Sequence, residues 1–292
     1  MPWETVLSNE IISYSAGEQA KDYAATGRKV VEHDGVFFNE VSPGYKVYWP
    51  IDVLHPHARA IKAIPATRGH KMVVADPAKA NGFLNIMVAR DVPDFDIGLL
   101  SKKRRSDVRR SLKRIEVRFM DEPEGLIAQG ASDVDASFRE RTGYGSVRSK
   151  PEFEEWLRSV MRHTGQRWYG AFVEGRLAGF SCMTVVNRNA CIGLLEVHTD
   201  FLADGTSTAL LYELCRRSRD SGQVDQIYFG LHSEKASLNR FKEGMLFKRR
   251  DLPCYVHLRV PMRWAVRLLK PRSYDRLIGF APEHYESSAE AS

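Results

Sequence analysis

The stretch from Ala190 to Phe247 decides the fold, and it contains in order ACIGLLEV (190–197), FLADGTST (201–208), ALLYELC (209–215), QIYFG (226–230) and SLNRFK (237–242). The first segment predicts a strand, the second a turn and the third an amphipathic helix. A short strand and another helix follow. Free backbone N–H groups at a helix N-terminus form a ready site for an anion. This order predicts a transferase that holds the phosphate end of an acyl donor.

The composition is that of an ordinary globular protein. The chain has 292 residues, of which 43% are hydrophobic and 27% charged, so it can hold one large or two small domains. The net charge of +6 favours polyanionic partners such as nucleotides, nucleic acid or anionic lipid. No apolar run is long enough to cross a bilayer, and no secretory signal is recognisable. A cytoplasmic location is therefore expected.

The four cysteines carry no metal or redox motif. Cys182, Cys191, Cys215 and Cys254 show no Cys-x-x-Cys spacing, and each lies among apolar residues. We expect reduced, buried thiols, with a catalytic cysteine as the minor alternative. No spacing of ligand residues predicts a metal site.

The rest of the chain reads as an alternation of strands and helices. Asp34–Gly35 between two apolar runs predicts a hairpin. A short helix is expected over Ala58–Ile64. Other expected strands cover residues 71–75, 83–89, 116–120, 168–173, 177–186 and 247–259, and other expected helices cover 124–141, 151–163, 206–220 and 235–243. The sequence thus predicts an α+β protein.

Residues 102–114 predict a helix with one strongly basic face. Leu100, Val108, Leu112 and Ile115 fall on one side of a 3.6-residue period. The other side carries Lys102, Lys103, Arg105, Arg109, Arg110, Lys113 and Arg114, with Arg104 nearer the apolar side. In most proteins, a run of charged residues like this one only faces the solvent and binds no partner. Self-repulsion of like charges nevertheless favours an anionic partner: a phosphate-bearing acceptor, a tRNA backbone or an acidic lipid.

Two parts of the sequence resemble known transferases. The order of elements over Arg167–Arg259, ending in SLNRFKEGMLF (237–247), resembles the GNAT (N-acetyltransferase-like) fold. LSKKRRSDVRRSLK (100–113) resembles the basic helix of FemAB-type transferases, which carry two GNAT-like halves. The resemblance implies a GNAT-like mixed sheet flanked by helices. It also implies four regions: an N-terminal half, complete or partial (1–120), a helical connection (121–165), a C-terminal GNAT-like domain (166–260), and helices with a disordered tail (261–292).

The resemblance also implies a donor site between two parallel strands that splay apart. The donor would lie along the strand end at Val197 and His198, and its phosphates on the turn of Asp204, Gly205, Thr206, Ser207 and Thr208, with Asn239 nearby. The corresponding turn of the family usually has more glycine, whereas here only Gly205 remains and Asp204 adds a negative charge beside the expected phosphates. Two donors therefore stay open, acyl-CoA and aminoacyl-tRNA. An ordinary turn with a helix cap is the simpler interpretation.

The same resemblance suggests the catalytic and acceptor-binding residues. Glu196 would be the base, Tyr228 the acid, and His232 would lie near the same opening. Arg104, Arg105 and Arg109 would bind the substrate. The acceptor would be an amine or a hydroxyl group, and the oligomeric state stays open.

Alternative interpretations remain. A non-catalytic nucleic-acid-binding protein would use helix 102–114, although no stacking aromatic residues interleave with its charges. A degenerate transferase fold kept as a scaffold is a third option. The amphipathic segment Pro261–Lys270 is expected to pack its apolar side on the domain, with contact to a membrane surface as the alternative.

Overall fold

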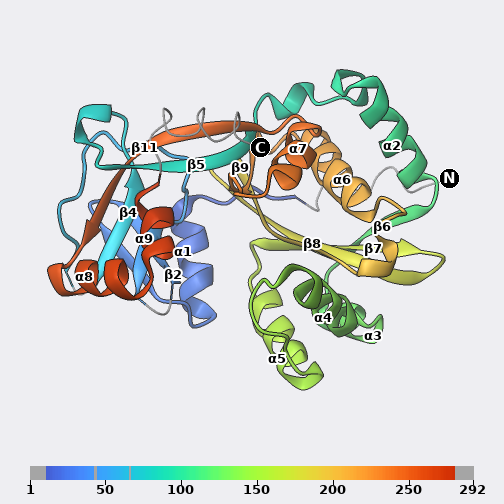
Figure 1. Cartoon of the computed structure of the whole chain (residues 1–292), viewed down its shortest axis with the longest axis horizontal. Helices are drawn as coiled ribbons and strands as arrows, with labels where there is room; N and C mark the ends of the chain where they lie inside the picture. The colour runs from blue at the N-terminus through green and yellow to red at the C-terminus, as the bar shows by residue number, and fades with distance from the viewer. Residues whose placement is uncertain (1–10, 43–44, 66, 280–292) are drawn as a thin grey trace. The chain divides into compact units, whose positions relative to one another are not determined.

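The computed structural model describes residues 11–42, 45–65 and 67–279, which form two compact units (Figure 1). Unit I consists of the described residues of 1–14 together with 89–230 and 235–247. Unit II consists of residues 15–88, 231–234 and 248–292, again where described. The tail after residue 286, expected to be disordered, lies outside the described residues. The boundary expected near residue 120 falls inside unit I, where the strand before it pairs with the strand at 166–173.

The sheet strands of unit I lie in the order β10-β9-β8-β7-β6. The strands are β6 (Ile115–Met120), β7 (Gln166–Val173), β8 (Arg176–Val186), β9 (Asn189–Val197) and β10 (Gln226–Leu231). Neighbours run antiparallel except β9 and β10, which are parallel. The expected meander of three antiparallel strands joined by tight turns, β7 to β9, is confirmed.

Helices cover both faces of this sheet. They are α2 (Lys102–Leu112), α3 (Pro123–Ala128), α4 (Ala131–Thr142), α5 (Lys150–Met161), α6 (Thr206–Ser221) and α7 (Ala236–Glu243). Figure 1 shows α3, α4 and α5 on one face of β7 and β8, and α6 on the other. The helix expected over 124–141 is broken between α3 and α4, because Gly130 takes a left-handed conformation with φ of 80°.

The core of unit I lies between the sheet and helices α3 to α5. Apolar side chains of α4, α5 and β7 to β8 meet there. Its fully buried members include Leu126, Val134, Phe153, Leu157, Trp168 and Phe180. This layer fixes α4 against β8 and β9, which positions the polar side chains of α4 described below.

The sheet strands of unit II lie in the order β1-β2-β3-β4-β11-β5. The strands are β1 (Val30–His33), β2 (Val36–Ser42), β3 (Val47–Pro50), β4 (Gly69–Val73), β5 (Gly82–Ala89) and β11 (Lys248–Leu258). Only β3 and β4 pair in parallel, through two residue pairs. The hairpin expected around Asp34–Gly35 is confirmed, since β1 pairs antiparallel with β2 across that turn.

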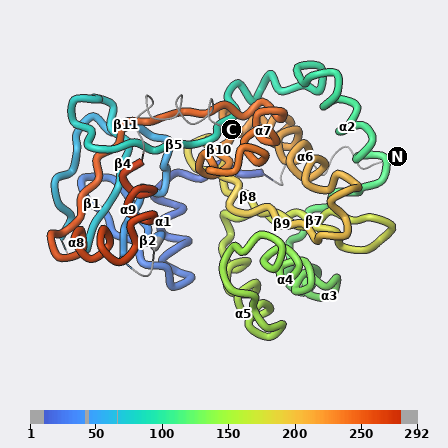
Figure 2. Tube along the Cα trace, in the orientation of Figure 1, coloured from blue at the N-terminus to red at the C-terminus, as the bar shows by residue number. Residues whose placement is uncertain are grey.

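Three helices accompany this sheet: α1 (Ala16–Ala25), α8 (Val260–Leu269) and α9 (Pro271–Ile278). The helix expected over Ala58–Ile64 is wrong, because no helix occurs between β3 and β4 among the described residues. His57 instead exchanges backbone hydrogen bonds with the end of β4: its N–H donates to Val73 O, and the N–H of Ala75 donates to its carbonyl. Figure 2 traces α8 and α9 as consecutive turns of the C-terminal segment.

The apolar surface of α8 is packed only in part. Val260, Trp264, Leu268 and Leu269 are all exposed, and Val266 is the residue of this helix that is buried. Within the described residues, no helix is long and apolar enough to cross a membrane.

Candidate active site

Strands β9 and β10 separate after a short stretch of parallel pairing. Residues Asn189–Cys191 pair with Gln226–Tyr228, and β9 then continues to Val197. The register between β9 and β8 shifts so that Gly193 is an extra residue, a β-bulge. A bulge bends its strand and increases the twist. The two strands thus pair only over this short stretch, and Glu196 and Tyr228 lie on adjacent strands. The donor wedge expected between them stays a prediction.

Glu196 is a buried carboxyl group near the end of β9, only 5% exposed. Burial first, and then the negative charge of Asp135, raise its pKa to about 7, while the charges of Arg139 and Arg148 oppose this shift. Within the described chain, Glu196 Oε2 and Asp135 Oδ2 are buried and receive no hydrogen bond. A hydrogen bond between the two carboxyl groups also raises the pKa of Glu196, because such a bond needs a proton on one of them. Such a group can take and return a proton near neutral pH.

Asp135 anchors the segment between α4 and α5 through two arginines. Arg139 Nε lies 2.7 Å from Asp135 Oδ1, and Arg148 Nη1 lies 3.3 Å from the same oxygen. Arg139 also donates to the backbone carbonyl of Tyr144 at 3.0 Å. Arg148 stacks over Trp156, with 4.0 Å from its guanidinium carbon to the ring centroid. The carboxylate next to Glu196 therefore also holds the loop of residues 143–149.

Tyr228 lies opposite Cys191 at the last paired position of β10. Burial, and next the neighbouring Cys191 and Tyr144, raise the pKa of the Tyr228 phenol. The phenol therefore stays protonated at neutral pH and can act as a hydrogen-bond donor or acid. Burial also raises the pKa of the Cys191 thiol to about 12, which disfavours the thiolate needed for a catalytic cysteine. All four cysteines are free.

His232 lies in unit II, whereas Glu196 and Tyr228 lie in unit I. Its backbone N–H donates to Asn85 O at 3.0 Å, within unit II. Its catalytic role stays a prediction.

The turn expected to hold the donor phosphates leads directly into α6. Gly205 is the N-cap residue, with φ of 84° and no side-chain cap hydrogen bond. A Cβ atom at this position would collide with Ser111 Oγ of α2. Asp204 forms an ion pair with Arg114 at 2.8 Å. Close packing against α2 therefore explains why a glycine is needed at this position. The negative charge of Asp204 beside the turn is compensated by Arg114, which follows α2.

The other residues of the expected donor site differ in exposure. Thr206, Thr208, Val197 and Asn239 are buried, while Ser207 is half-buried. Thr206 Oγ1 donates back to Phe201 O at 2.9 Å, so this hydroxyl serves the turn itself. The backbone N–H groups at the first turn of α6 remain the atoms that suit an anion.

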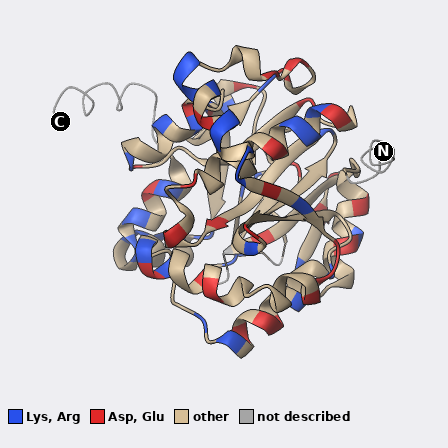
Figure 3. Ribbon diagram, turned by 90° about the vertical axis from the view of Figure 1, so that its right-hand side faces the viewer, with Lys and Arg blue, Asp and Glu red and all other residues tan. Residues whose placement is uncertain are grey.

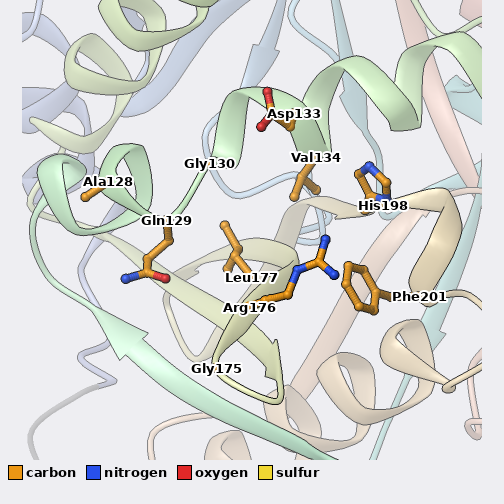
Figure 4. A pocket seen from close by; sticks show the side chains of 10 residues that line it. All are labelled: Ala128, Gln129, Gly130, Asp133, Val134, Gly175, Arg176, Leu177, His198 and Phe201. Carbon is orange, nitrogen blue, oxygen red and sulfur yellow. The ribbon is translucent and has the colours of Figure 1, made fainter.

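The His198 side chain lines a separate pocket of about 300 Å³ (Figure 4). Gly130, Arg176 and Phe201 also border it, with the Arg176 guanidinium carbon 5.2 Å from the Phe201 ring centroid. His198 Nδ1 accepts a hydrogen bond from the backbone N–H of Asp200 at 3.3 Å. A donor along β9 would therefore meet the backbone of His198 rather than its imidazole.

The basic helix α2 forms as expected, and Figure 3 marks its Lys and Arg residues among those of the chain. Arg104 lies 5.6 Å from the ring centroid of Phe241 in α7, and Arg105 donates to Gly98 O at 2.8 Å. Arg109 is exposed. Arg104 is thus held against α7, whereas Arg109 is available to an anion in solution.

Sequence reasoning missed several residues of this region. Lys242 in α7 is buried and donates to Phe229 O at 2.8 Å, one residue past the last paired residue of β10. Gly193 carried a usable signal, because glycine inside a strand often marks a bulge. Asp135 and Arg139 carried another, the i,i+4 spacing of an ion pair on a helix. Their position beside Glu196 depends on how α4 packs on the sheet. Among the described residues, no group of side chains suits a metal ion.

Known structures of the same fold support this description. FemX is similar to this chain with a TM-score of 0.59 and 12% identity, covering 86% of this chain and 92% of FemX. The C-terminal domain of a protein described as a lysylphosphatidylglycerol synthetase, from Agrobacterium fabrum, gives 0.57 and 13%, covering 92% and 99%. L-PGS from Bacillus licheniformis gives 0.57 and 12% with the same coverages. No protein-family model matches the chain, and no curated protein matches it in sequence. The chain has a GNAT-like fold of FemAB type.

Proposed function

We propose that the chain is an acyltransferase or aminoacyltransferase that works at the splayed strands β9 and β10. The observation that carries the proposal is Glu196, a buried carboxyl with a pKa raised to about 7, on the strand that pairs in parallel with the strand of Tyr228. The acceptor amine or hydroxyl attacks the carbonyl carbon of the donor, and Glu196 takes the proton that the acceptor loses. The bond from carbonyl carbon to the leaving sulfur or ribose oxygen breaks, and Tyr228 supplies a proton to that atom.

Two contacts favour aminoacyl-tRNA over acyl-CoA as the donor. A glycine in this turn could let a diphosphate approach the backbone closely, but Ser111 occupies the space next to Gly205. Arg114, which could bind a phosphate, already forms an ion pair with Asp204. The exposed cations of α2 also suit a nucleic-acid backbone. We therefore propose aminoacyl-tRNA as the donor, with α2 as its phosphate-binding surface and acyl-CoA as the competing donor.

Thermal unfolding with different ligands tests the donor. A ligand at about 100 times its Kd stabilises the folded state by about 2.7 kcal/mol, which is a shift of several degrees in Tm. We expect a larger shift with aminoacyl-tRNA than with the same tRNA uncharged, and none with acyl-CoA. A shift with acyl-CoA alone would instead support the second donor.

The second candidate is a nucleic-acid-binding protein without catalytic activity, favoured by the exposed cations of α2. It predicts equal shifts with charged and uncharged tRNA, strong salt dependence and no transfer of the aminoacyl group. Donor-dependent transfer lost in Glu196→Gln, with tRNA binding retained, would exclude this candidate.

A further inference from the structure

Helix α8 exposes a row of large apolar side chains. Val260 is 67% exposed, Trp264 57% and Leu268 73%. Because these residues are four apart, they form one stripe along the helix. Leu269, at the end of the helix, is 80% exposed. Such a stripe is unusual on a surface, where large apolar residues are normally scattered singly.

The stripe is distinct from the side by which α8 is attached to unit II. Val266 is 4% exposed, and Met262 and Ala265 on the same side are half-buried. The helix thus already has an inner apolar side, formed by residues three and four apart. The exposed stripe is a second one, and the contacts of unit II leave it open to solvent.

A row of cations runs beside the stripe. Arg259, Arg263 and Arg267 each precede a stripe residue by one position, and Lys270 and Arg272 follow. No acidic residue occurs between 259 and 274. In the described part of the chain, the side chains of Arg263 and Arg267 are exposed and make no ion pair. The surface therefore combines apolar side chains, tryptophan and uncompensated positive charge.

This combination matches an anionic bilayer surface better than a second copy of the chain. Tryptophan and leucine can enter the boundary between headgroups and acyl chains, while arginines bind the lipid phosphates. A symmetric dimer through α8 would bring the same arginine row of both copies together. Like charges in one interface are costly unless anions separate them.

We propose that α8 binds the surface of an anionic lipid bilayer, with Val260, Trp264 and Leu268 entering the interface and Arg263 and Arg267 contacting lipid phosphates. The helix lies in the plane of the interface and does not cross it. This docking surface lies in unit II and does not depend on the reaction proposed for unit I.

Flotation of the purified full chain with vesicles tests the proposal. The chain should float with vesicles of phosphatidylcholine and phosphatidylglycerol, and much less with phosphatidylcholine alone. The double variant Trp264→Ala, Leu268→Ser should lose most of the binding to both. Arg263→Gln with Arg267→Gln should weaken binding to the anionic vesicles by roughly 30-fold, since each basic residue near the surface contributes about fivefold.

Matched controls come from unit I. Lys150→Gln with Arg162→Gln removes two exposed cations at the ends of α5, and Leu99→Ser removes an apolar side chain that is 59% exposed. Both should bind anionic vesicles like the unchanged chain, and circular dichroism should show all variants folded. The proposal is overturned if the unchanged chain does not float with anionic vesicles, or if the Trp264→Ala, Leu268→Ser variant floats normally. It is equally overturned if that variant only converts a dimer to a monomer, without a change in vesicle binding.

Discussion

Units I and II each contain one pair of parallel strands among antiparallel ones, but the two pairs are connected differently. In unit I, the chain between β9 and β10 forms the Gly205 turn and the 16-residue helix α6. In unit II, the described residues between β3 and β4 contain no helix. Only unit I therefore offers a helix N-terminus after the first of its parallel strands, together with a bulge in that strand. Two groups of strands of similar construction thus differ in a feature that the proposed donor site requires.

Each unit also buries at least one charged side chain whose pKa moves toward neutrality. Burial raises the pKa of Glu196 in unit I to about 7 and lowers that of Lys71 in unit II to about 8. Lys71 Nζ donates to Phe83 O at 2.6 Å and to Leu277 O at 2.7 Å, and it lies 5.5 Å from the Trp49 ring centroid. Glu196, in contrast, has a buried oxygen that receives no hydrogen bond in the described chain. A shifted pKa alone therefore does not mark a catalytic group.

The largest effect should come from Glu196→Gln, which keeps the shape of the side chain but cannot take a proton. We expect kcat to fall by about 10²- to 10⁴-fold, the usual contribution of a positioned base. Single-turnover transfer with the donor identified by thermal shift measures this. Lys71→Met, in a protein that remains folded, should leave kcat within about twofold if the two buried groups differ as described.

A control within unit I is Glu213→Gln on α6. Glu213 is a buried carboxylate, 9% exposed, but it forms an ion pair with Arg216 at 2.8 Å. Its loss should leave kcat nearly unchanged. An equal loss of kcat in both variants would show that Glu196 acts through folding rather than through chemistry.

The next largest effect concerns stability in unit II. Because Lys71 has a pKa of about 8 when folded and 10.5 as its ordinary value, the unfolded chain binds more protons between these values. Its contribution to stability is therefore present above pH 10.5 and is lost as the pH falls through 8. The total is about 3 kcal/mol. The free energy of unfolding of the unchanged chain, minus that of Lys71→Met, should rise by this amount across the interval.

Urea unfolding at several pH values measures this difference. Subtracting the two free energies cancels the contributions of the other lysines, tyrosines and cysteines, which titrate in both proteins. Burial also lowers the pKa of Lys242, in unit I, to about 8. The same measurement on Lys242→Met therefore compares the two units. A difference that stays constant with pH would mean that the Lys71 ammonium is as well solvated in the folded state as in the unfolded one.

The sequence was sufficient for most of unit I and for less of unit II. Tight turns at Gly175 and Asn187–Arg188, and the periodicity of α6, gave the order from β7 to β11. The helix expected over Ala58–Ile64 failed because His57 pairs with the end of β4, a long-range contact that overrides local preference. The exposed stripe of α8 was missed for the opposite reason. Its periodicity predicted a helix correctly but could not say which of two apolar sides would be covered.

The candidate site shows a similar division. Glu196 and Tyr228 could be proposed because the order of strands places them on neighbours. Asp135 could not, because its proximity to Glu196 depends on α4 lying across β9, about 60 residues later in the chain. A local pattern gives the Asp135–Arg139 pair, whereas only the fold gives the pair of carboxyl groups.

The smallest effect should distinguish the two carboxyl groups. If Glu196 is the base, kcat rises as the pH passes through about 7, where Glu196 loses its proton. Asp135→Asn removes the negative charge that helps to raise this pKa, so the rise should move to lower pH, by roughly one unit. Asp133→Asn, two residues earlier on α4, is the control, because Asp133 is exposed and does not act on Glu196.

Asp135→Asn also loosens Arg139 and with it the carbonyl of Tyr144, which lowers the plateau of kcat. The two effects separate in the pH profile, since a loose loop lowers the plateau without moving the midpoint. An unmoved midpoint with a lowered plateau would assign Asp135 to the loop alone and leave the raised pKa of Glu196 to burial.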